Sequence, residues 1–265
     1  MELEGCNALI TGASAGIGRE FARQLGGRAR SLILIARREQ RLHELRDELN
    51  QQHPKLAISF RKTDLADLAQ VNELLAWLDR ERIDIDLLIN NAGLGDSGAF
   101  ATSDPIRNEQ MTLVNTVALT TLTRHLLPGM IARRRGGILN VSSSAGFLPI
   151  PDFAVYAATK AYVTSFSEAL RAELRRTGVS VCALCPGPVH TEFQAAAKRP
   201  GAQPDTGPEF VFAPVEQVVR NALAALEADR PLVIPGLPMK LGMFLVRRIP
   251  MPILRLLSRL SPRRG

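Results

Sequence analysis

The 265-residue sequence has only three cysteines and no long apolar run, and both shortages exclude classes of protein. Three cysteines cannot form a disulfide framework, so we expect a reducing compartment and a cytoplasmic protein. No segment approaches the roughly 18 apolar residues that a membrane-spanning helix needs. The first residues carry acids where a signal peptide needs bases. With 46% hydrophobic residues, the chain can bury a large core and is not intrinsically disordered.

Acidic residues are absent from residues 231–265, which carry the bases Lys240, Arg247, Arg248, Arg255, Arg259, Arg263 and Arg264. The first 230 residues balance 26 bases against 26 acids, so the net charge of +7 comes from this tail. The body therefore has no electrostatic reason to bind nucleic acid or a membrane, and we expect no nucleic-acid partner.

Short apolar runs alternate with longer amphipathic segments along the chain. We expect strands at 8–11, 31–36, 57–61, 87–90, 137–141, 179–184 and 232–234. Most are continuous apolar runs, which are typical of strands covered on both faces. The alternation predicts an α/β fold, a single-domain Rossmann-type doubly wound parallel sheet of about seven strands with helices on both faces. We expect this domain to span 1–235, followed by a basic, apolar and helical C-terminal tail at 236–265.

The first expected strand runs into a glycine-rich turn at residues 11–18, followed by a helical run. The residues of this turn that we expect to bind a cofactor are Gly12, Ser14, Ala15, Gly16, Ile17 and Gly18. Backbone N–H groups and a helix N-terminus converge there and favour phosphate. The spacing G-x-x-x-G-x-G differs from the G-x-G-x-x-G fingerprint, so an ordinary glycine turn is the alternative.

The same turn also matches G-x-S-x-G, the nucleophile elbow of serine hydrolases, with Ser14 as the nucleophile. In that fold the acid and histidine partners follow the serine late in the chain. Here the serine precedes nearly all of the sheet, and none of the four histidines lies in an obvious late strand-end loop with a partnering acid. A serine hydrolase is therefore a remote alternative.

The end of the second expected strand indicates which dinucleotide binds. A site for NAD usually places an acid there for the ribose 2′-hydroxyl, whereas a site for NADP supplies arginine for the 2′-phosphate. Here Ala36 is followed by Arg37, and arginine favours bidentate contact with phosphate. The sequence predicts NADP(H), with a solvated helix start at Arg37 and Arg38 as the alternative.

Tyr156 and Lys160 are spaced i, i+4 on an expected helix, which places them on one face. Ser143 lies just past the strand expected at 137–141. A free tyrosine has a pKa near ~10, and we expect the Lys160 cation to lower it. The phenol could then exchange a proton with a carbonyl or alcohol oxygen that the serine hydroxyl holds. This equipment suits hydride transfer between a nicotinamide and a carbonyl group.

Taken together, these elements resemble the short-chain dehydrogenase/reductase superfamily, in its single-domain NADP-preferring form, from residue 5 to about residue 235. The matching motifs are TGASAGIG at 11–18, Asp64-Leu65, Asn90-Asn91-Ala92-Gly93, Asn115, Ser143, Tyr156 with Lys160, and Pro186-Gly187-Pro188-Val189-His190-Thr191. Singly, several of these residues have structural explanations, such as a helix N-cap at Asp64. Their joint order and spacing are specific.

The resemblance implies roles for individual residues. Ser143, Tyr156 and Lys160 would carry catalysis, and Asn115 would complete a proton relay through water. The implied cofactor contacts outside the glycine-rich turn are Arg37, Asp64, Leu65, Asn91, Ala92, Gly93, Tyr156, Lys160, Pro186, Gly187, Val189 and Thr191. Members of the superfamily are commonly dimers or tetramers, so we expect a homodimer or homotetramer.

The sequence therefore predicts an NADP(H)-dependent oxidoreductase that interconverts a ketone or aldehyde and an alcohol, with Tyr156 as general acid/base. We expect a small, hydrophobic substrate. A non-catalytic NADP-binding regulator or scaffold is the main alternative. Cys182 and Cys185 are spaced as C-x-x-C but lack a second ligand pair, so we expect no metal site.

Residues 237–260 combine apolar helical stretches with spaced arginines and two prolines. They could cover the substrate cleft or pack on a second subunit, because apolar surface needs cover. They could instead make peripheral membrane contact, with the arginines toward anionic lipid. Nucleic-acid binding is the weakest interpretation, because basic residues without a binding fold are poor grounds for it.

Overall fold

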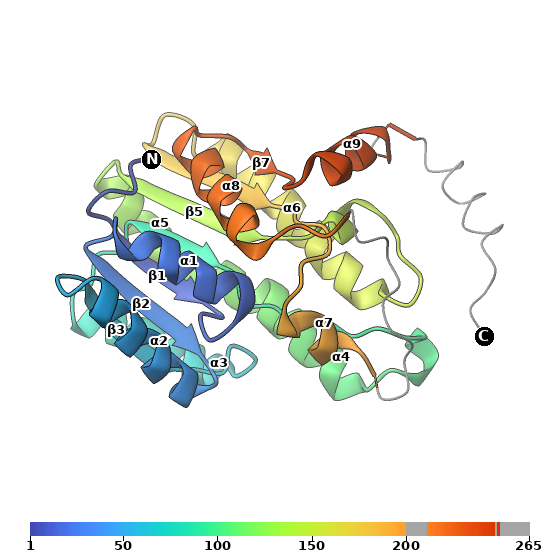
Figure 1. Cartoon of the computed structure of the whole chain (residues 1–265), viewed down its shortest axis with the longest axis horizontal. Coiled ribbons are helices and arrows are strands. Elements are labelled where there is room, and N and C mark those ends of the chain that lie inside the picture. Colours follow the sequence, from blue (N-terminus) through green and yellow to red (C-terminus); the bar gives the residue numbers. More distant parts are fainter. Residues whose placement is uncertain (200–210, 247, 250–265) are drawn as a thin grey trace.

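The computed structural model describes residues 1–199, 211–246 and 248–249, which form a parallel sheet between two layers of helices (Figure 1). The strand order is β3-β2-β1-β4-β5-β6-β7. The strands are β1 Asn7–Thr11, β2 Ser31–Ala36, β3 Ala57–Lys62, β4 Leu87–Asn90, β5 Gly136–Val141, β6 Val179–Leu184 and β7 Leu232–Val233. The expected seven-stranded doubly wound sheet is confirmed.

Each face of the sheet is covered by its own helices. One layer contains α1 (Gly16–Gly26), α2 (Glu39–Gln52) and α8 (Val215–Glu227), and the other contains α3 (Leu68–Arg80), α5 (Leu119–Ala132) and α6 (Ala154–Glu173). In β1, Ala8 and Ile10 belong to the first core, whereas Leu9 belongs to the second. Burial on both faces explains why the strands read as continuous apolar runs.

The edge strand β3 differs from the expectation of burial on both faces. Ala57 and Ser59 are exposed, whereas Ile58 and Phe60 are half-buried. Among the described residues only β2 pairs with this strand, which lies at the edge of the sheet.

The remaining elements are η1 (Phe100–Thr102), α4 (Pro105–Thr112), the π-helical η2 (Leu113–Ala118), η3 (Ser144–Phe147), α7 (Glu192–Ala197) and α9 (Leu237–Val246). Figure 1 shows α4 and α7 beyond the edge where the strands end. The neighbours of β1 are β2 and β4, so the order of the strands reverses between β1 and β4. Open α/β sheets bind ligands at such a switch point.

Helix α9 begins the tail, and the rest of the expected tail, apart from residues 248 and 249, lies outside the described residues. On α9 the side chains of Leu237, Leu241, Phe244 and Leu245 are exposed. Across the described part of the chain, no helix has both the length and the hydropathy needed to cross a membrane.

Candidate active site

The glycine-rich turn packs against the end of β4. Gly12 has a φ of +68°, and a Cβ on Gly18 would lie 2.3 Å from the Gly12 carbonyl oxygen and 2.4 Å from Asn91 Nδ2. Asn91 Nδ2 donates a 2.8 Å hydrogen bond to the Thr11 carbonyl oxygen. The backbone N–H groups of Asn91 and Ala92 each donate to Thr11 Oγ1 at 3.0 Å. The two strand ends therefore meet so closely that these positions require glycine.

The first turn of α1 fits the phosphates of a dinucleotide. Its N-cap residue, Ala15, has no side chain to satisfy the free N–H groups, and the turn holds no acidic residue. The positive end of the helix is thus left for an external anion. Gly16, with a φ of +51°, faces the methyl group of Thr191, where a Cβ would lie 3.1 Å away.

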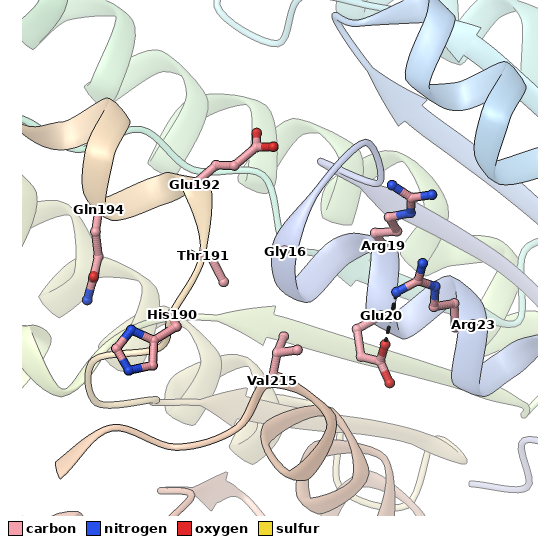
Figure 2. A pocket seen from close by; sticks show the side chains of 9 residues that line it. All are labelled: Gly16, Arg19, Glu20, Arg23, His190, Thr191, Glu192, Gln194 and Val215. Carbon is pink, nitrogen blue, oxygen red and sulfur yellow. Dashed lines mark ion pairs between the residues drawn. The ribbon is translucent and has the colours of Figure 1, made fainter. Parts of the chain in front are cut away.

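A cavity of about 560 Å³ opens beside this turn (Figure 2). Arg19, Glu20 and Arg23 of α1 line one side. The other side is lined by His190, Thr191, Glu192 and Gln194. Gly16 of the glycine-rich turn and Thr191, which faces it, both line the cavity, so the expected phosphate site adjoins it.

Two arginines follow the end of β2. Arg37 is exposed, and its Nη1 lies 3.8 Å from Asp64 Oδ2. Arg38 Nε and Nη2 donate hydrogen bonds of 3.3 and 3.2 Å to Ser14 Oγ. Arg38 therefore lies directly over the glycine-rich turn, although we considered it only as part of a solvated helix start. The sequence feature that could have indicated this contact is the second arginine after the strand.

These contacts also argue against a hydrolase. Ser14 is buried, and its hydroxyl oxygen accepts from a guanidinium group. Arginine stays protonated and cannot serve as the general base that a serine nucleophile requires.

Asp64 and Leu65 follow β3, beside this end of the site. Asp64 Oδ1 accepts from the Ala66 N–H, but Asp67, not Asp64, is the N-cap of α3. The Leu65 side chain is buried in the core. Asp64 thus holds the turn before α3 and faces Arg37 at the end of β2.

Ser143, Tyr156 and Lys160 come together at the ends of β5 and α6. Tyr156 and Lys160 lie on adjacent turns of α6, with Lys160 Nζ 5.8 Å from the centre of the tyrosine ring. Lys160 Nζ donates a 2.8 Å hydrogen bond to the Val141 carbonyl oxygen. Ser143 caps η3 by accepting from the Ala145 N–H at 3.1 Å. Both Tyr156 and Lys160 are buried.

Burial, rather than pairing, sets the pKa values of these two groups. Loss of solvent raises the pKa of Tyr156 to about 12, partly offset by a hydrogen bond with Ser143. It lowers the pKa of Lys160 to about 8. The net pKa of Tyr156 is therefore raised, opposite to the expected direction, because the penalty for burying a phenolate dominates.

Asn115 occupies η2, where the helix between α4 and α5 widens into a π turn. Such turns occur frequently at functional sites. Its Nδ2 donates to the Leu94 carbonyl oxygen and to Thr159 Oγ1, each at 3.0 Å, and its Oδ1 accepts from the Leu94 N–H at 2.8 Å. A Cβ on Gly93 would lie 3.4 Å from Lys160 Nζ and 3.5 Å from Asn115 Oδ1. Asn115 thus fixes the loop after β4 beside Lys160.

Aromatic side chains surround Tyr156, and the sequence analysis missed them. The ring centres of Phe153 and Phe193 lie 5.9 and 5.5 Å from that of Tyr156. Phe193 also faces Gly95, where a Cβ would lie 2.8 Å from its ring. Phe153 is the N-cap residue of α6, three residues before Tyr156, whereas the proximity of Phe193 depends on how α7 packs beyond the strand ends.

The segment from Pro186 to Thr191 links β6 to α7. The Pro186 carbonyl oxygen accepts from the Ser144 N–H at 2.9 Å, which ties this segment to η3. Val189 is buried, and Gly187 faces Met239 of α9, whose Cε would lie 2.5 Å from a Cβ there. Helix α9 therefore packs against the expected nicotinamide end of the cleft.

A family model described as short chain dehydrogenase matches residues 6–201. The chain belongs to the short-chain dehydrogenase family. It is 40% identical over 187 residues to the NADP-dependent 3-hydroxy acid dehydrogenase YdfG of Escherichia coli O157:H7, which covers 70% of this chain and 73% of that protein.

Solved structures of other short-chain dehydrogenases cover nearly the whole chain. A short-chain dehydrogenase from Sphingobium yanoikuyae in complex with NADPH has a TM-score of 0.82 and 31% identity, covering 98% of this chain and 97% of that one. The bulky-bulky ketone specific alcohol dehydrogenase from Comamonas testosteroni has a TM-score of 0.77 and 29% identity, covering 98% and 96%. The predicted family and fold are confirmed.

The buried Lys160 of this short-chain dehydrogenase predicts a pH-dependent stability. Its folded pKa, about 8, lies below the ordinary value of 10.5, so the unfolded chain binds the proton more tightly. The cost in folding stability of burying the Lys160 ammonium is full at pH 8 and below, and it disappears as the pH rises toward 10.5. Over that window the wild type should gain up to about 3 kcal/mol of unfolding free energy relative to Lys160→Met, measured by urea denaturation. The exposed Lys55→Met should follow the wild type, and a pH-independent difference for Lys160→Met would contradict the burial effect.

Proposed function

We propose that this chain is an NADP(H)-dependent oxidoreductase that interconverts a ketone or aldehyde and an alcohol, with Tyr156 as its general acid/base. The observation that carries the mechanism is the meeting of Ser143, Tyr156 and Lys160 beside the loop after β4. The reaction class and cofactor agree with the relatives, of which one is NADP-dependent and another is complexed with NADPH.

The cofactor, when bound, supplies the hydride to the carbonyl carbon. The Ser143 hydroxyl holds the carbonyl oxygen, and the Tyr156 hydroxyl gives its proton to that oxygen, which completes the alcohol. With a pKa of about 12 the phenol is protonated at neutral pH, which is the form that reduction requires. The ammonium group of Lys160 then stabilises the phenolate that remains.

Asn115 acts as a positioning residue in this proposal. Its amide engages both backbone groups of Leu94 and the Thr159 hydroxyl, so it holds the loop that carries Gly93. Asn115 Oδ1 has a second lone pair, which could accept from a water that returns a proton to the site.

We assign the cofactor contacts by position along the cleft. The turn residues Gly12, Ser14, Ala15, Gly16, Ile17 and Gly18 would hold the pyrophosphate, because α1 leaves its first N–H groups uncapped. Arg37 and Arg38 would bind the 2′-phosphate. The adenine would lie at Asp64 and the Leu65 backbone, and the nicotinamide half would lie along Asn91, Ala92, Gly93, Pro186, Gly187, Val189 and Thr191.

We propose an apolar carbonyl substrate, because Phe153 and Phe193 flank the Tyr156 ring. We place this chemistry within residues 1–235. The tail keeps three interpretations: cover over the substrate cleft, contact with a second subunit of a homodimer or homotetramer, and contact with anionic lipid. The contact of Met239 with Gly187 supports the first, and the exposed apolar side chains of α9 beside Lys240 support the other two. A cytoplasmic location stays a prediction.

Replacing the Tyr156 hydroxyl tests the mechanism. Tyr156→Phe should lower kcat for carbonyl reduction by at least about 10²-fold, because no proton donor remains, while the Kd for NADPH stays near the wild-type value. Tyr162→Phe is the matched control on the same helix, since its exposed hydroxyl contacts only Thr120 among the described side chains. Its turnover should match the wild type.

Wild-type turnover in Tyr156→Phe would contradict the assigned role. A wild-type protein that binds NADPH but reduces no ketone or aldehyde in a chemically broad panel would favour the regulator or scaffold.

Reversing the charge at Arg37 tests the cofactor assignment. Arg37→Glu should raise the Kd for NADPH by at least about 10-fold, while the Kd for NADH changes little, since only NADPH carries the 2′-phosphate. Fluorescence titration measures both, with the exposed Arg80→Glu on α3 as the control. Equal effects of Arg37→Glu on the two cofactors would refute the assignment.

A further inference from the structure

The first residue of α7 is joined to the arginines at the end of β2. The Glu192 carboxylate pairs with Arg38 Nη1 at 2.7 Å and forms a second ion pair with Arg41 on α2. Glu192 and Arg38 are 154 residues apart in the sequence. We call these two contacts the Glu192 ion pairs.

Each of the three guanidinium nitrogens of Arg38 donates one hydrogen bond in this arrangement. Nε and Nη2 donate to Ser14 Oγ, and Nη1 donates to Glu192. The five N–H groups of a guanidinium leave two for a phosphate, which would then share Arg38 with the Glu192 carboxylate. Of the two acceptors of Arg38, Glu192 carries the charge that a phosphate would repel.

The other end of α7 is fixed by different partners. The Ser97 N–H donates to the Ala197 carbonyl oxygen at 2.8 Å, and Arg107 Nη2 donates to that of Ala196 at 3.2 Å. Just beyond the helix, Arg199 pairs with Asp96 at 2.6 Å. The Glu192 ion pairs thus tie the beginning of α7 to the cofactor side of the cleft.

Phe193, next to Glu192 in the sequence, connects the beginning of α7 to Tyr156. Its ring lies between Gly95 and Tyr156, with ring centres 5.5 Å apart for the second contact. A shift at the beginning of α7 would therefore move the ring that covers Tyr156.

We propose that Glu192 is a positioning and specificity residue whose carboxylate competes with the cofactor 2′-phosphate for Arg38 and Arg41. NADH leaves the Glu192 ion pairs intact, whereas NADPH breaks them and frees the beginning of α7 with Phe193. This inference rests on the proposed cofactor site. The exposure of all three side chains fits the competition, because exposed ion pairs are weak and easily displaced.

The charge state of Glu192 is compatible with this competition. Hydrogen bonds from Arg41 and Arg38 lower the pKa of its carboxyl to about 2, so it is ionised at any working pH. The competition therefore operates between two anions and weakens with ionic strength.

The Glu192→Gln variant, which keeps the side-chain shape and removes the charge, tests the competition. Its Kd for NADPH, and for the fragment adenosine 2′,5′-bisphosphate, should fall by about three- to ten-fold at 50 mM salt. The Kd values for NADH and 5′-AMP should not change, and the NADPH effect should shrink at 0.5 M NaCl. Glu109→Gln, an exposed acid on α4, serves as the control and should leave all four Kd values unchanged.

Kinetics test the link to Phe193. With NADH, Glu192→Gln should raise the KM for a carbonyl substrate, because the variant lacks the ion pairs that the wild type keeps. With NADPH, the two proteins should have the same KM.

The outcomes separate this inference from the proposed function. A wild-type protein that binds neither NADPH nor the bisphosphate would remove the cofactor site itself. Normal NADPH binding by the wild type, with an unchanged or weaker NADPH affinity in Glu192→Gln, would overturn the competition alone. An equal shift in KM with both cofactors would overturn the link to Phe193.

Discussion

The contact between the ends of β1 and β4 is the constraint on which the site depends. Thr11 Oγ1 donates to the Ile89 carbonyl oxygen at 3.3 Å and accepts from two N–H groups of the neighbouring loop. Asn91 closes the arrangement through its amide. Since Gly18 fits only because it lacks a Cβ, the start of α1 is pressed against this contact. The phosphate site and the loop beside Lys160 thereby share one support.

The second constraint is the cost of burying charge around Tyr156. The protein raises the tyrosine pKa and lowers the lysine pKa, so the two shifts oppose formation of a phenolate–ammonium pair. The resting site thus holds a protonated phenol, which is ready to donate. Oxidation of an alcohol requires the deprotonated tyrosine, whose formation is opposed by burial of Tyr156.

The sequence predicted the elements whose signals are local. Strands buried on both faces are continuous apolar runs, so their ends were predicted to within one residue, and the motif residues lie on or beside strand ends as expected. The half-exposed β3 was not predicted, because a run of alternating side chains does not reveal that a strand lies at an edge. The contact of Phe193 with Tyr156 and the ion pairs of Glu192 arise only from the packing of α7 beyond the strand ends, and no local pattern encodes that.

The site thus divides into a rigid part and an adjustable part. The groups proposed for catalysis are buried and anchored on β5, α6 and η2, where a lost contact leaves polar atoms unsatisfied in the core. The groups proposed to choose between cofactors are exposed arginines and a glutamate on separate elements, whose interactions are weak and screened by salt. Substitutions that change cofactor preference should therefore affect the folding stability of this chain little, whereas substitutions of the acid/base group should lower it more. Because Phe193 follows Glu192 directly, a change in cofactor preference also reaches the substrate side of Tyr156.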